Sequence, residues 1–242
     1  MRLIPLVVAA FILSTPAFAQ DWEPFVSAED GFSANFPGKP KVETIVYDTE
    51  YRQKLPGRVY SAQDVMGRYS TTVVDYRGVE KLHNDTVAKC RAAKGANGFD
   101  GDACQNDFRV DVAGAMDYAA WNFMKRDGVK ITQYMWYFLE IVSGRLLQLT
   151  NADQSRTFAV IHQHAGRLYI HQATVTKGMP EPILFMQNLG FVDEQGRNVR
   201  YRTFYTEGYG EWQFPHAIPP RTARDINGPY TEAPAAPTTP AR

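Results

Sequence analysis

Three closely spaced histidines are the residues of this chain whose types and spacing could do chemistry. His162 and His164 lie just before the dipeptide Ala165-Gly166, and His171 follows it. If Ala165-Gly166 is a two-residue hairpin turn, the three imidazoles share one side of the hairpin with Tyr169. Such a face could bind Zn²⁺ or Cu²⁺, and an open fourth position would permit hydrolysis. A three-residue loop would instead place His171 on the opposite side.

The same histidines also have a structural interpretation. Phe158, Val160 and Tyr169 are expected on their face of the hairpin, so the imidazoles could be half-buried residues satisfied by hydrogen bonds. No acidic residue that would orient a metal-bound imidazole can be named from the sequence. We therefore expect no cofactor, and a zinc or copper site at the three histidines is the alternative.

Other signatures of catalysis or metal binding are missing from the sequence. It contains no G-x-S-x-G, no H-E-x-x-H and no phosphate-binding glycine loop. Asp100, Asp102 and Asp111 have spacings found in calcium-binding EF-hand loops, but Gln105 stands where that motif requires glycine. The sequence predicts no catalytic residue and favours a protein that is not an enzyme.

An aromatic run, from Tyr134 to Phe138, is the second candidate site. On a strand, Tyr134 and Trp136 take one face, and Met135 and Tyr137 take the other. Apolar side chains on both faces predict a central strand that is covered on both sides. If one face were uncovered, Tyr134, Trp136 and Tyr169 are the residues we expect to line a ligand groove.

The two cysteines, Cys90 and Cys104, are predicted to form a disulfide. They are the only cysteines of the chain, and in an oxidising compartment a lone pair this close in sequence is most simply a disulfide. The alternative, a reactive thiol, lacks a C-x-x-C motif.

The first residues have the pattern of a signal peptide. Arg2 is followed by an apolar stretch over 3–13, and Ala17-Phe18-Ala19 is a small-x-small cleavage site. The apolar stretch is shorter than the roughly 20 residues that a spanning helix needs, and no later stretch reaches that length. We expect cleavage near Ala19, a periplasmic or secreted location, and no membrane-spanning segment.

Charge gives little indication of a nucleic-acid partner. The chain has 26 Lys and Arg residues and 26 Asp and Glu residues. Nucleic-acid binding by phosphate neutralisation requires a basic face, which this balance does not favour. The expected partner is an envelope protein or a small ligand.

The order of predicted elements indicates an α+β fold. Strands are predicted at 31–36, 42–51, 58–65, 69–76, 130–142, 145–150, 157–164 and 167–175, and helices at 84–94, 115–126 and 183–189. Turns are expected at Pro56-Gly57, Gly67-Arg68 and Ser143-Gly144. The result should be a largely antiparallel sheet flanked by two or three helices. Residues 1–19 are predicted as signal peptide, 20–205 as a single α+β domain, and 206–242 as a proline-rich, largely disordered tail.

Particular segments resemble secreted bacterial proteins with the PsbP-like fold. They are WEPF at 22–25, DGFSANFPGKP at 30–40, GRLLQL at 144–149 and the helix through Phe185. The resemblance covers most of 22–201 and implies an α/β/α sandwich with non-catalytic assembly or binding roles. It carries over no functional residue, because the shared positions are turn and core residues. Together with the export signal, it predicts an exported accessory or binding module.

Overall fold

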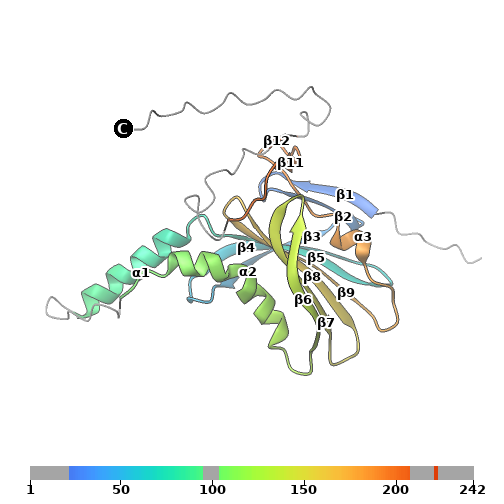
Figure 1. Cartoon of the computed structure of the whole chain (residues 1–242), viewed down its shortest axis with the longest axis horizontal. Helices are drawn as coiled ribbons and strands as arrows, with labels where there is room; N and C mark the ends of the chain where they lie inside the picture. Colours follow the sequence, from blue (N-terminus) through green and yellow to red (C-terminus); the bar gives the residue numbers. More distant parts are fainter. Residues whose placement is uncertain (1–21, 95–103, 208–220, 223–242) are drawn as a thin grey trace, which may run out of the picture.

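The computed structural model describes residues 22–94, 104–207 and 221–222, and its centre is a seven-stranded antiparallel sheet (Figure 1). The strands are β3 (Lys41–Asp48), β4 (Lys54–Gln63), β5 (Gly67–Asp75), β6 (Lys130–Leu139), β7 (Val142–Thr150), β8 (Arg156–His164) and β9 (Arg167–Val175). Their order across the sheet is β3-β4-β5-β9-β8-β7-β6. The predicted α+β fold with a largely antiparallel sheet is therefore confirmed.

The remaining elements are short strands and three helices. A second sheet has the order β1-β2-β10, from β1 (Trp22–Ser27), β2 (Phe32–Pro37) and β10 (Gly190–Phe191). The strands β11 (Val199–Arg200) and β12 (Arg221–Thr222) pair with each other. The helices are α1 (Val79–Lys94), α2 (Phe108–Met124) and α3 (Ile183–Met186).

Helix α2 covers one face of the large sheet. Its buried side carries Ala115, Ala119 and Ala120, which pack in one cluster with Leu147 and Ile161 of the sheet. Alanines have little side-chain volume, so the helix backbone can approach the strands closely. We call this side the helix face.

The opposite face is covered by the β1-β2-β10 sheet together with α3. Phe32 of β2, Phe185 of α3 and Phe191 of β10 join one buried cluster with Tyr69 and Tyr169 of the large sheet. We call this side the histidine face, because it also carries the three histidines. Its cover is a small sheet and a single helical turn, where the sequence predicted helices on both flanks.

All three predicted turns lie inside strands. Gly67-Arg68 begins β5, and the chain reverses just before it, at 64–66. Pro56-Gly57 belongs to β4, and the chain reverses at 49–53 instead, where Thr49 N donates to Gln53 O. Pairing of β4 with β5 begins only at Gly57, so Pro56 sits at the margin of the sheet, where a missing N–H is tolerated. Ser143-Gly144 belongs to β7, and the β6–β7 turn is Glu140-Ile141, with φ of 48° and 68°.

Both long helices begin earlier than predicted. Helix α1 begins at Val79, and Val79, His83 and Val87 form its buried stripe at a spacing of four. Because His83 is polar, the stripe is not recognised by a pattern of apolar residues at helical spacing. Helix α2 begins at Phe108, seven residues before the predicted Ala115. In Figure 1, α1 projects away from the sheets, with α2 returning beside its base.

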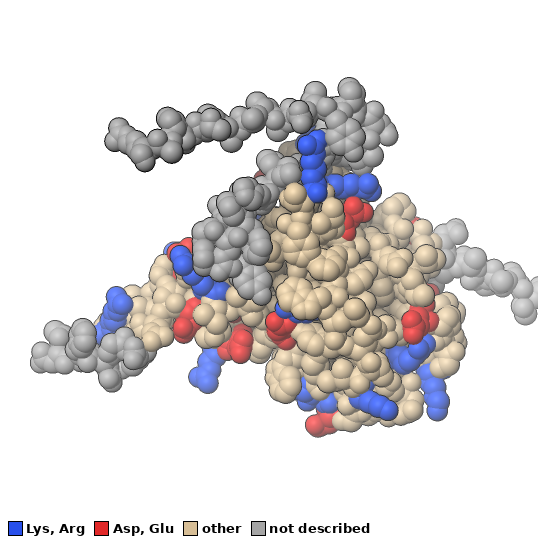
Figure 2. All heavy atoms as spheres, viewed as in Figure 1, with Lys and Arg blue, Asp and Glu red and all other residues tan. Residues whose placement is uncertain are grey.

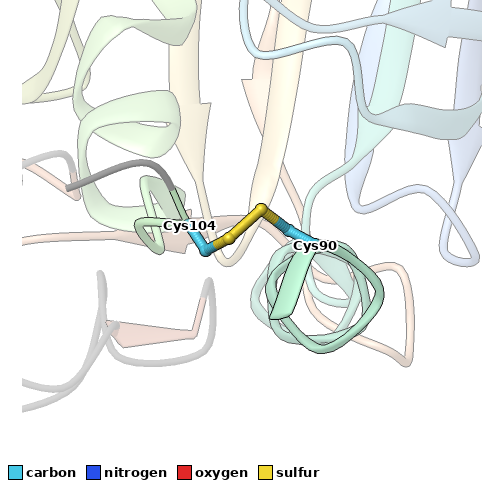
Figure 3. The surroundings of a disulfide bond; sticks show 2 residues. All are labelled: Cys90 and Cys104. Atoms are coloured by element: carbon cyan, nitrogen blue, oxygen red, sulfur yellow. A yellow bond between two sulfur atoms is a disulfide. The ribbon is translucent and has the colours of Figure 1, made fainter. Parts of the chain in front are cut away.

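The predicted disulfide is confirmed. Cys90 lies in α1 and Cys104 lies before α2, with a Cα–Cα distance of 5.7 Å (Figure 3). The bond therefore joins the projecting helix to the segment that leads back into the domain. Three other predicted features lie outside the described residues: the signal peptide, the acidic residues Asp100 and Asp102, and almost all of the tail. No helix within the described ranges has both the length and the apolar character needed to cross a bilayer.

Candidate functional site

The β8–β9 hairpin brings the three histidines to one face, as predicted. Ala165 and Gly166 form a two-residue turn with φ of 49° and 70°. His162 is opposite Tyr169, and His171 is opposite Val160. Residues directly opposite each other share a face, so all three imidazoles lie on the face covered by the β1-β2-β10 sheet and α3.

All three histidines are closed off from solvent. The exposed fractions of His162, His164 and His171 are 0%, 4% and 0%. Both ring nitrogens of His171 have partners, because Nδ1 is 2.8 Å from Thr71 Oγ1 and Nε2 is 2.8 Å from Phe185 O. The imidazole of His171 is therefore fully used by the protein itself.

His162 and His164 each have one partner and one open nitrogen. His162 Nδ1 donates to Ser143 O at 3.1 Å, and His164 Nε2 is 2.7 Å from Tyr201 Oη. His162 Nε2 and His164 Nδ1 are buried without a hydrogen-bond partner among the described residues. Buried unpaired polar atoms are costly, so these nitrogens are the least satisfied part of the cluster.

Aromatic rings surround the imidazoles and keep them neutral. Phe185 stacks on His171 with centroids 3.9 Å apart, and Phe191 stacks on His164 at 4.3 Å. Burial lowers the pKa of His162 and of His171 to about 4. Burial, helped by the nearby Arg167 charge, lowers the pKa of His164 to about 3. The imidazolium form is disfavoured because a charge has no water around it there.

The predicted metal site gains no ligand set from this geometry. Within the described ranges, no three His, Cys, Asp or Glu side chains are grouped as a metal ion would require. Both ring nitrogens of His171 form hydrogen bonds with protein atoms. Each of the other two imidazoles has one nitrogen without a hydrogen-bond partner among the described residues. Two nitrogens fall short of the three protein ligands typical of catalytic zinc.

A segment that the sequence did not indicate closes the turn end of this cluster. We call residues 201–207 the C-terminal strap. Tyr205 exchanges backbone hydrogen bonds with Ile141 and Ser143, and its hydroxyl accepts from Ala165 N at 3.1 Å. The Glu207 carboxylate accepts from Gly166 N, and burial raises the pKa of that carboxyl. The strap therefore supplies hydrogen-bond acceptors for the N–H groups of Ala165 and Gly166 in the turn.

The three residues predicted to line a groove are divided between the two faces. Tyr134 is opposite Leu147, which belongs to the helix-face cluster, whereas Tyr169 is fully buried on the histidine face. Tyr134, Trp136 and Tyr169 therefore do not line one groove. The prediction of a central strand for the run from Tyr134 to Phe138 is wrong as well. This run lies in β6, which is the last strand of the sheet, and Trp136 is 52% exposed.

A charged pair and two aromatic residues form a small cluster on β6, β7 and α2. The Arg145 guanidinium lies 4.1 Å above the Trp136 ring and binds Asp117 of α2, with Nε 2.6 Å from Oδ1. Tyr134 donates its hydroxyl proton to the same carboxylate. These contacts fix the aromatic side chains in place on the helix face.

An apolar groove beside α3 is a second site that the sequence did not indicate. It has a volume of ≈ 560 Å³ and is lined by Trp22, Asn35, Met66, Tyr69, Glu181, Pro182, Ile183, Leu184, Phe185, Gln187 and Asn188. The Trp22 ring contacts Tyr69 and Phe185 with centroids 5.0 Å and 5.9 Å away. Trp22 comes from β1, which no predicted strand included, so its position in this groove was not predicted.

A third polar cluster lies inside the protein where α1 and α2 meet the β3–β4 turn. His83 Nε2 is 2.9 Å from Asp111 Oδ2, and Thr49 donates to the same oxygen at 2.7 Å. Their exposed fractions are 4%, 1% and 2%. Although His and Asp occur together in catalytic sites, this pair is sealed from solvent and joins both helices to the sheet.

Comparison with known proteins gave one structural neighbour among the solved structures. No family model and no curated protein sequence matches the chain. The solution structure of cyanobacterial PsbP (CyanoP) from Synechocystis sp. PCC 6803 is similar, with 8% identity and a TM-score of 0.36, over 67% of this chain and 84% of that one. A likeness at this identity and TM-score supports no conclusion about the fold or the function of this chain.

Proposed function

We propose that this chain is an exported, non-enzymatic accessory module that binds an envelope protein through the apolar groove beside α3. The observation that carries the proposal is the exposed apolar surface of α3. Leu184 is 84% exposed and Ile183 is 54% exposed, at the edge of a ≈ 560 Å³ groove. Contiguous exposed apolar surface around a groove is typical of an interaction site.

The groove is rigid enough to act as a preformed site. Phe185 and Met186 anchor α3 in the core beneath it, and the Trp22 ring is held against Tyr69 and Phe185. Binding to a preformed pocket avoids the entropy cost of ordering it. Aromatic and methionine side chains are also enriched in the centres of protein interfaces.

A protein partner fits this site better than a small ligand does. A small molecule in the groove would leave the protruding Leu184 side chain in water, whereas a partner surface would cover both the groove and that side chain. Interface energy typically concentrates where an anchoring side chain fills a desolvated pocket. We infer that the partner inserts an apolar side chain between Trp22 and Leu184.

Two observations support the non-enzymatic and exported parts of the proposal. The polar clusters most suggestive of catalysis, at His162 and at His83, are at least 96% buried, so a substrate has no access to them. The Cys90–Cys104 disulfide fits an oxidising compartment, in line with the signal-like first residues.

Site-specific photocrosslinking tests the proposed surface. A photoreactive phenylalanine analogue at Leu184 should give one reproducible envelope-protein adduct in cells of the source organism. The matched control position is Val46, which is 67% exposed on the distant strand β3. Ile183→Asp should remove the adduct, because a carboxylate would be buried against the partner. Identical adduct patterns at Leu184 and Val46 would refute the proposed site.

Metal binding at the histidines is the second candidate. The two unpartnered nitrogens, His162 Nε2 and His164 Nδ1, are the observation that keeps it open. Elemental analysis of the purified chain decides the matter, together with the His162→Ala variant. Less than one equivalent of any transition metal, unchanged in the variant, eliminates this candidate.

A further inference from the structure

The outer edge of β6 is an unusually apolar sheet edge. Within the described ranges no strand pairs with it. Its exposed large apolar side chains are Ile131, Tyr134, Met135, Trp136 and Phe138. Figure 2 shows few charged side chains over this part of the surface. The other edge strand, β3, carries Lys41, Glu43 and Asp48, which is the usual protection of a sheet edge.

The direction of the free backbone groups follows from the β6–β7 turn. Glu140-Ile141 is a two-residue turn, so Leu139 and Val142 form the hydrogen-bonded pair that closes it. Hydrogen bonding to β7 then alternates along β6. The N–H and C=O groups of Tyr134, Trp136 and Phe138 point outward, away from β7. The register is regular from Gln133 to Leu139, and its irregularity lies between Ile131 and Gln133.

We propose that β6 pairs antiparallel with β6 of a second copy of this chain, with Met135 opposite Met135, to form one continuous sheet. In this register Tyr134 of each copy is opposite Trp136 of the other. Both residues direct their backbone groups outward, so the hydrogen bonds of the two edges match. Residues directly opposite each other also share a face, which places these aromatic side chains side by side.

The charges at the two ends of β6 favour the same register. When Met135 is opposite itself, Lys130 of one copy lies near Glu140 of the other, and the twofold axis repeats the pair. Both side chains are exposed. Glu140 Oε2 is 3.3 Å from Arg200 Nε, which leaves its other carboxylate oxygen for the lysine. A strand whose two ends carry opposite charges is complementary to itself when it pairs antiparallel.

The proposed dimer and the groove proposed to bind an envelope protein use different residues, although Tyr137 of β6 and Ile183 of the groove border one smaller pocket. The groove lies beside α3 and β1, whereas the dimer uses β6 at the end of the large sheet. Loss of dimerisation would therefore leave binding at the groove unchanged. The experiments can therefore show that one proposal fails while the other holds.

A cysteine crosslink tests the register directly. Both native cysteines are held in a disulfide, so a new cysteine is the sole free thiol of the chain. In the Met135→Cys variant, two thiols face each other at a non-hydrogen-bonded position, where Cα atoms are about 4.5 Å apart. We expect most of the protein to become a covalent dimer under mild oxidation. Val46→Cys, exposed on β3, should stay below a tenth of that yield.

Charge reversal tests the ends of the interface in solution. Analytical ultracentrifugation of the native chain should give a dimer, and Lys130→Glu should weaken it about tenfold, because each end then carries like charges. The double variant Lys130→Glu/Glu140→Lys should restore most of this loss; the remainder reflects the new positive charge beside Arg200. A chain that is monomeric at 100 µM, or a dimer that neither crosslinks through Met135→Cys nor responds to Lys130→Glu, overturns the proposal.

Discussion

The two faces of the large sheet are packed in different ways. On the helix face, alanines of α2 meet Leu147, Ala159 and Ile161, and packing depends on shape and apolar area. On the histidine face, aromatic rings meet His162, His164 and His171, whose ring nitrogens need partners. One face of the sheet thus has a cover of small apolar side chains, and the other has a cover that depends on neutral imidazoles.

The difference shows where polar groups are tolerated in a core. A histidine inside the sheet-to-helix layer would push α2 away, since its alanines pack directly against the strands. Helix α3 and the strap instead supply the groups that reach two of the imidazoles, namely Phe185 O and Tyr201 Oη. Carbonyl and hydroxyl groups of short segments can thus satisfy buried imidazoles.

The largest expected effect is the loss of stability in acid. The three histidines, His162, His164 and His171, have pKa values of about 4, 3 and 4 in the folded protein, below the ordinary histidine value of about 6.5. Between about pH 6.5 and pH 4 the unfolded chain therefore binds more protons, so stability falls as the pH falls. From pH 7 to pH 5 the loss is about 2 kcal/mol for each histidine. Urea unfolding at both pH values measures it.

The variant His164→Phe isolates the contribution of one histidine. It keeps an aromatic ring against Phe191 but removes a titrating group, so about a third of the acid-induced loss should disappear. Glu207 acts in the opposite direction, because burial raises its pKa and protonation therefore favours the folded state. An acid-induced loss that is the same in His164→Phe and the native chain would contradict this account.

Truncating one core residue on each face gives the next largest effect. Phe191→Ala should cost about 4 kcal/mol of unfolding free energy and Leu147→Ala about 3 kcal/mol, from lost burial and the cavities left behind. Phe191→Ala should also reduce the pH dependence, because it uncovers the His164 ring and raises its pKa toward the ordinary value. Leu147→Ala should leave the pH dependence unchanged. Equal pH profiles for the two variants would count against the contrast between the faces.

The smallest effect concerns the turn between β6 and β7. Ile141 has a φ of 68°, a conformation that a β-branched residue rarely adopts. Ile141→Gly should raise the unfolding free energy by about 1 kcal/mol through relief of this strain. Val46→Gly, at an exposed strand position, is the control and should lower stability. Thermal unfolding distinguishes the two, and a destabilised Ile141→Gly would show that the side chain matters more than the backbone.

Local patterns were enough to predict the β8–β9 hairpin. Its strands alternate in character and Ala165-Gly166 is a short turn, so the face shared by the histidines could be inferred correctly. The disulfide was predictable in the same way, since only Cys90 and Cys104 were available. These features depend on residues that are near each other in the chain.

Features that depend on distant partners were not predictable. The apolar run in β6 is the same whether the strand is central or at the edge, because edge position depends on which strands pair around it. Trp22 and the C-terminal strap contact residues that are far away in sequence. The same holds for Tyr169, whose hydroxyl group donates to Asp30 O across a separation of 139 residues. No local pattern contains that information.

The histidine face is completed by segments from opposite ends of the described chain. Its cover combines β1 and β2 with α3, β10 and the strap, which are the blue and orange parts of Figure 1. During synthesis or secretion, the early strands must therefore wait for residues near 207 before this layer can form. Until residues near 207 are available, the imidazoles of this face stay open to solvent, and their neutral, buried state is reached only in the last stage of folding.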